Sequence, residues 1–79
     1  MELLEKLRQA IERGHPNEAE RLACTALDSR IDPLFIVDDA MMPAMRSVGE
    51  RYKNDEADIM RILAAARSLR ICFELIEKR

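Results

Sequence analysis

Apolar residues recur at intervals of three and four along most of this chain, the spacing of one face of an α-helix. In residues 2–13 the apolar positions are Leu3, Leu4, Leu7, Ala10 and Ile11. In residues 16–29 they are mostly small, namely Ala19, Leu22, Ala23, Ala26 and Leu27. Gly14 is placed to end the first helix, and Pro16 suits the first turn of the second. The pattern predicts two amphipathic helices joined by a tight turn.

The third apolar segment, residues 33–53, begins at a helix-start pair in which Asp32 is the N-cap and Pro33 the first helical residue. Its expected inner stripe is Leu34, Val37, Met41, Ala44, Met45, Val48 and Tyr52. Pro43 removes one backbone hydrogen bond and should bend this helix. Gly49 costs about 1 kcal/mol relative to alanine, and such a glycine is typical of a place where a backbone or ligand comes close.

The fourth segment, residues 58–78, carries more apolar surface than one neighbouring helix needs. One broad face holds Ile59, Ile62, Leu63, Ala65, Ala66, Leu69, Cys72, Phe73 and Ile76. A second, narrower strip holds Met60, Ala64, Ile71 and Leu75. This long helix should therefore be central to the fold, or it should present one side to something outside.

Composition agrees with a single all-α domain over residues 1–79. The 79 residues are 48% apolar and 35% charged, with two Gly and three Pro, and no segment alternates as a strand would. Four helices with short connections predict a four-helix bundle whose third helix is bent by proline. A core of this size supplies only modest stability.

Charge and cysteine content exclude several classes of protein. The net charge is −2, and basic and acidic residues are intermixed, which disfavours nucleic acid as a partner. The N-terminus is acidic from Glu2 and has no long apolar run, so neither a signal peptide nor a membrane span is expected. Cys24 and Cys72 are expected to be buried, free thiols of a cytoplasmic protein.

No arrangement of residues indicates catalysis or a metal. His15, the only histidine, lies between two helices without a second ligand near it in sequence. The acidic residues Asp38, Asp39 and those of 50–56 do not have the spacing of a calcium loop. Triad, phosphate-loop and zinc motifs are missing, so we do not expect an enzyme.

The order of these elements resembles a known family. The glycine turn after "AIE", the "DP" at 32–33, "PAMRSVGERY" at 43–52 and "LAAARSL" at 63–69 are together similar to the helical cap domain of cobalamin-binding modules, as in methionine synthase and the corrinoid proteins of methyltransferases. Nearly the whole chain is covered. In that family Pro43 and Gly49 fall at third-helix positions, so their bend and close approach look like features of the fold.

The resemblance implies a four-helix lid over the upper face of the corrin ring during methyl transfer in one-carbon metabolism. It implies that cobalamin is held through a separate doubly wound, Rossmann-type domain with a D-x-H-x-x-G motif. That motif is absent from this chain, so the chain alone should bind cobalamin weakly or not at all. The partners implied are that corrinoid-binding domain and a methyltransferase subunit.

Family positions give three candidate cofactor-binding residues. Related sequences carry an aromatic and an aliphatic residue followed by proline before the fourth helix, where this chain has Asp58, Ile59 and Met60. Asp58 either faces the upper ligand or caps the fourth helix, because an ionised carboxylate against a methyl group is costly. Ala65 and Ser68 fall where larger apolar residues can occur in the family.

Two classes of function remain open. The first is the lid of a corrinoid protein, and the second is a helical interaction or sensor domain of the same fold that dimerises or docks a partner without corrinoid. Met42, Met60, Ile71 and Leu75 are the expected partner-facing residues. Because the sequence ends inside a helix at "ELIEKR", we expect it to be the N-terminal part of a longer chain.

Overall fold

The computed structural model describes residues 1–54 and 59–78, which form helices joined by short turns, without a strand among them. The elements are α1 (Glu2–Glu12), α2 (Pro16–Asp28), α3 (Pro33–Ile36), the π-helix η1 (Val37–Met41), α4 (Met42–Lys53) and α5 (Ile59–Glu77). The predicted all-α class is confirmed. The expected third helix is a continuous helical column made of α3, η1 and α4.

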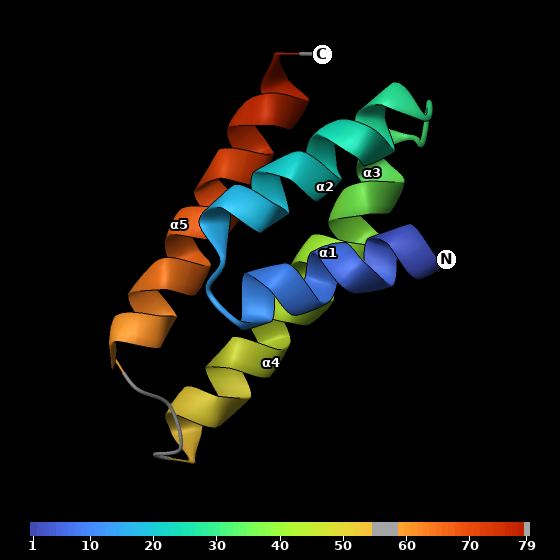
Figure 1. The fold of residues 1–79 in the computed structure, drawn as a ribbon. Helices are drawn as coiled ribbons and strands as arrows, with labels where there is room; N and C mark the ends of the chain where they lie inside the picture. The colour runs from blue at the N-terminus through green and yellow to red at the C-terminus, as the bar shows by residue number, and fades with distance from the viewer. Residues whose placement is uncertain (55–58, 79) are drawn as a thin grey trace.

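The helices pack in two pairs that share one core. Helix α5 packs mainly along α2, whereas the column of η1 and α4 packs against α1. Figure 1 shows α1 between α2 and α4, with α5 running beside α2 to the C-terminal end. Helices α4 and α5 share few contacts although they are consecutive. The surfaces that these two helices turn toward each other are therefore only partly covered.

The turn between α1 and α2 depends on Gly14, as the sequence predicted. Gly14 has a φ of 71°, and its N–H donates to the carbonyl of Ile11 while that of His15 donates to Ala10. This pair of bonds is a Schellman motif, whose left-handed residue is usually glycine. A Cβ built on Gly14 would lie only 2.7 Å from the Cβ of Ala64. The absence of a side chain thus lets the turn pack directly on α5.

The start of the third column is also as predicted. The carboxylate of Asp32 accepts the N–H of Leu34 at 3.0 Å, and Pro33 occupies the first turn. Together they satisfy one free backbone donor and pre-set the helical φ, so the column begins where the two residues place it.

Helix α2 ends in the same kind of turn as α1, but with Arg30 in the left-handed position, at a φ of 63°. A residue with a Cβ is strained there, whereas glycine is not. Arg30→Gly should therefore stabilise the fold by about 0.5–1 kcal/mol, after allowing for the greater freedom of glycine in the unfolded chain. Urea unfolding measures this gain. Ser29→Gly is the control, since Ser29 has a φ of −81° and gains nothing.

The third column departs from the expected register. Its buried residues are Ile36, Ala40, Met41 and Ala44, and the π-turn of η1 ends two residues before Pro43. The predictions that Leu34, Met45 and Tyr52 face inward are wrong, because their exposed fractions are 71%, 46% and 63%. The predictions for Met41 and Ala44 are confirmed, and Ala40 is buried beside them; small residues such as the two alanines are the usual choice where helices approach closely. Of the larger apolar side chains of the column, Ile36 and Met41 are buried, whereas Leu34, Met45 and Tyr52 are exposed.

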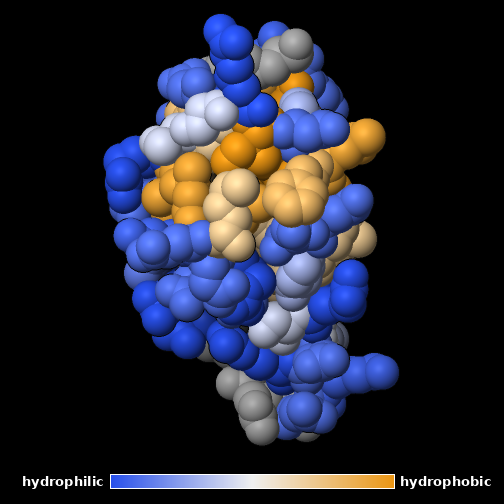
Figure 2. Space-filling view, turned by 90° about the vertical axis from the view of Figure 1, so that its right-hand side faces the viewer, coloured by the Kyte–Doolittle hydropathy of each residue, from blue (hydrophilic) through white to orange (hydrophobic). Residues whose placement is uncertain are grey.

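An exposed apolar area lies at the N-terminal end of this column. Leu34, Phe35 and Met42 are exposed, as is Met1. Figure 2, which faces the side of the molecule on which α3 lies, shows apolar side chains gathered within a hydrophilic border. This area lies on the opposite side of the column from α5.

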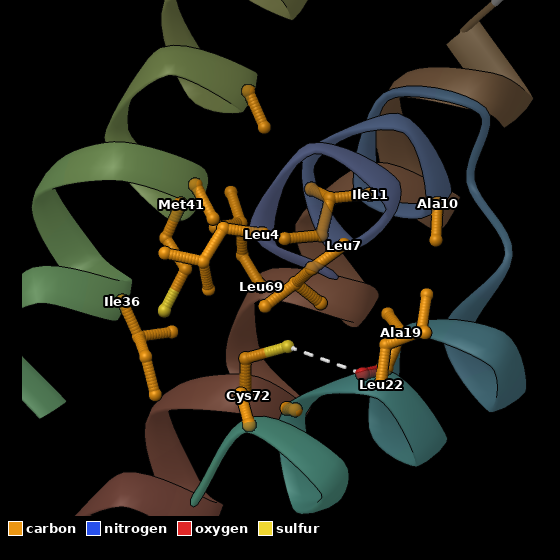
Figure 3. Packing of buried hydrophobic residues seen from close by; sticks show 14 of the residues in the cluster. Leu4, Leu7, Ala10, Ile11, Ala19, Leu22, Ile36, Met41, Leu69 and Cys72 are labelled. Carbon is orange, nitrogen blue, oxygen red and sulfur yellow. Dashed lines mark hydrogen bonds between the residues drawn. The ribbon is translucent and has the colours of Figure 1, made fainter. Parts of the chain in front are cut away.

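The core lies where α1, α2, η1 and α5 meet (Figure 3). Leu7, Ile11, Ile36, Met41 and Cys72 are fully enclosed. The Cys72 thiol donates to the carbonyl oxygen of Ala19 with an Sγ to O distance of 3.9 Å, and burial raises the pKa of this thiol to about 12. Both cysteines are free, as expected, but Cys24 is half-buried rather than buried.

The predicted surplus of apolar surface on α5 is confirmed. Ala65, Ser68, Leu69 and Cys72 fill the core side of the helix. Four large apolar residues of the same helix remain exposed, namely Ile59, Met60, Leu63 and Phe73. In the described part of the chain, no helix is long and apolar enough to cross a membrane.

Candidate functional site

A groove of about 250 Å³ runs between α4 and α5. Its lining residues are Met45, Val48, Gly49 and Tyr52 of α4 and Ile62, Ala65, Ala66 and Leu69 of α5. None of the eight carries a charge, and the hydroxyl of Tyr52 is the only polar side-chain group among them. The groove is therefore an apolar surface open to one side.

The groove follows from the way each helix is packed. Because α4 is held by α1 and α5 by α2, the two helices do not close on each other. Met45 and Tyr52 project from α4 into this space while keeping about half of their surface exposed. Their burial would be favourable, at roughly 25 cal/mol per Å² of apolar surface. No described part of the chain buries these two side chains further.

The first turns of α5 extend this apolar surface beyond the groove. Ile59 and Leu63 are four residues apart, hence on one side of the helix, and their exposed fractions are 61% and 59%. Ala66, which lines the groove, lies on the same side and is also exposed. Apolar residues exposed over consecutive turns are characteristic of a surface that something else covers.

Gly49 contributes bare backbone to the groove wall. It is exposed, and a Cβ built on it would meet no atom within 4 Å outside its own helix. The close approach expected at Gly49 is thus not made by any described part of this chain. This contrasts with Gly14, where Ala64 occupies the space.

The three predicted cofactor-binding residues have different surroundings. Ala65 is buried and lines the groove. Ser68 is fully buried on the core side, where its hydroxyl donates to the carbonyl of Ala64 at 2.8 Å. Asp58 lies outside the described residues. A role in cofactor binding stays a prediction for all three.

The four predicted partner-facing residues do not form one continuous surface. Met42 and Met60 are exposed, whereas Ile71 is half-buried and Leu75 packs against the core. Between Met60 and Ile71 on this strip, Ala64 lies against the turn at Gly14. A partner bound to these residues stays a prediction.

The size and chemistry of the groove limit what it can do. Pockets that enclose a small-molecule ligand usually have volumes of about 300–1,000 Å³, so this groove covers part of a large ligand and does not surround it. The described residues hold no group of three or more His, Cys, Asp or Glu that could bind a metal ion. Contact with an apolar partner is the chemistry that the lining supports.

Sequence reasoning found the α5 side of the groove and missed the α4 side. Ile62, Ala65, Ala66 and Leu69 were all on the broad apolar face expected of the last helix. Met45 and Tyr52 were assigned to the core because they continue the apolar stripe of the third helix at helical spacing. The one indication of their position was Gly49, which falls between them and was already expected to allow a close approach.

Comparison with known proteins agrees with the resemblance. This chain is 27% identical over 75 residues to monomethylamine corrinoid protein 1 of Methanosarcina acetivorans; the match covers 95% of this chain and 34% of that relative. The chain thus spans about a third of the relative's length. No solved structure matches it significantly. The family described as B12 binding domain matches residues 3–77, and the chain belongs to this family as a helical cap-type domain of corrinoid proteins.

Proposed function

We propose that this chain is the lid of a corrinoid protein and covers the upper face of cobalamin during methyl transfer. This proposal rests on the apolar groove between α4 and α5, whose lining carries no charge. A corrin ring is a large, flat and mostly apolar surface, and it needs a complementary apolar cover to exclude water. The exposed residues of the first turns of α5 enlarge that cover.

The residues of this chain would act by contact and exclusion. Met45 and Tyr52 from α4 and Ala66 from α5 would lie against the ring, with their apolar surfaces replacing water. When bound, cobalamin supplies the methyl–cobalt bond at which group transfer occurs. The single histidine of the sequence, His15, lies in the turn between α1 and α2 and does not line the groove. The cofactor would be held by a separate doubly wound domain.

A chimera tests the proposal. This chain replaces the matched third of the Methanosarcina acetivorans corrinoid protein, and the product is loaded with methylcobalamin. Under constant light, the methyl group should be lost several-fold more slowly than from the same protein with the segment deleted, because the lid excludes water and oxygen. Absorbance spectra follow this loss.

Two matched substitutions locate the covering surface. Met45→Glu places a carboxylate in the groove, where contact with the ring would leave it desolvated, and should remove most of the protection. Leu34→Glu makes the same change at an exposed apolar residue of α3 away from the groove and should leave protection unchanged. Equal effects of the two variants, failure of the chimera to load, or a light sensitivity equal to that of the deletion protein would contradict the proposal.

The alternative of an interaction domain without corrinoid has less support. It relied on a strip through Met60, Ile71 and Leu75, yet Leu75 packs against the core. Leu75→Glu would therefore unfold the domain rather than report on association. Exposed apolar surface of α5 also lies beside the groove, at Ile59 and Leu63.

A further inference from the structure

Gly49 is a helix-interior glycine that the described fold does not require. It is the eighth of the twelve residues of α4, and only Gly14 of the two glycines has a positive φ. Replacing a glycine by alanine in a helix interior normally favours folding. A Cβ at Gly49 would meet nothing within 4 Å beyond its own helix. Neither backbone conformation nor internal packing explains the residue.

The residues on either side of Gly49 define the space that its missing side chain leaves in the groove wall. Met45 precedes it by one turn and Tyr52 follows it by nearly one turn, so the three lie on the same side of α4. Both neighbours are large and line the groove with Gly49. The wall therefore has a notch one side chain wide, with helix backbone at its floor.

We infer that Gly49 sets the distance of closest approach between α4 and the bound corrinoid. This inference rests on the proposed function. The notch lets the upper face of the ring reach van der Waals contact with the backbone of α4, with Met45 and Tyr52 on either side. A methyl group at this position holds the ring away by its own thickness and opens a path for water.

The inference separates folding from covering, so its test measures folding on the cofactor-free chain and protection in the loaded chimera described above. Gly49→Ala should raise the folding equilibrium constant about fivefold and yet lose most of the protection of methylcobalamin against light. Gly49→Leu should lose all of it. The control variants Glu50→Ala and Glu50→Leu change the neighbouring exposed residue, which does not line the groove, and should keep full protection.

The possible outcomes distinguish this inference from the proposed function. Protection retained by both Gly49 variants, while Met45→Glu loses it, would overturn the role of Gly49 and leave the lid in place. A Gly49→Ala variant that unfolds more easily would show that the fold itself needs glycine and would also overturn the inference. If the unsubstituted chimera gives no protection, the proposed function and the inference both fail.

Discussion

Gly14→Ala should destabilise this protein by about 3 kcal/mol, a large share of the stability of so small a domain. Two costs add. The left-handed conformation of alanine at a φ of 71° lowers the free energy of unfolding by about 1–2 kcal/mol. Its methyl group would also lie 2.7 Å from the Cβ of Ala64, and relieving such an overlap in packed structure costs about 1–3 kcal/mol.

Urea unfolding followed by circular dichroism measures the loss. Gly49→Ala is the matched control, because it makes the same chemical change in a helix interior with open space around it. That variant should gain up to about 1 kcal/mol. Two changes of the same sign would show that the contact between the turn and α5 is not as described.

Leu7→Ala should cost about 3 kcal/mol. Leu7 is fully buried in the core between α1 and its neighbours (Figure 3). Removing its isobutyl group loses the transfer free energy of the side chain and leaves a cavity that the helices fill only in part. The effect should appear as a lower midpoint of thermal and urea unfolding.

Leu34→Ala provides the comparison for this prediction. The sequence pattern predicts that Leu34 lies on the inner stripe of the third column, whereas its side chain is 71% exposed. The substitution should change the unfolding free energy by less than about 0.5 kcal/mol. A cost similar to that of Leu7→Ala would mean that the sequence-based register is the correct one.

The helix boundaries could be predicted from the sequence because local chemistry determines them. Asp32 and Pro33 begin a helix through a side-chain cap and a fixed φ, and Gly14 ends one through a left-handed turn. Each of these effects acts within a few residues, so it is visible without knowledge of the rest of the fold. The surplus apolar face of α5 could be predicted for the same reason, since it needs only the helical period.

The register of the third column could not be predicted because it depends on tertiary packing. The predicted stripe correctly included Met41 and Ala44, but its other large members Leu34, Met45 and Tyr52 are exposed. Ile36 and Ala40 are buried in their place. Small residues are favoured at a contact between helices because they let the two helix backbones approach each other. The π-turn at η1 also interrupts the regular 100° step on which the projection relies.

The same limitation explains the half of the candidate site that was missed. Ala65 was identified through family positions and does line the groove. Met45 and Tyr52 line it because α4 and α5 are packed against different neighbours and stay apart. Apart from Gly49, no pattern within a single helix carries that information. A large apolar residue outside the core is thus best interpreted together with the helix that faces it.

The central claim is that the groove between α4 and α5 is the surface that meets the corrinoid. The most direct test is a comparison of amide chemical shifts of the labelled chain, within the chimera, before and after loading with methylcobalamin. We expect the largest changes at Met45, Gly49 and Ala66, with little change at Leu34 and Phe35. Changes concentrated at α3, with the groove residues unaffected, would contradict it.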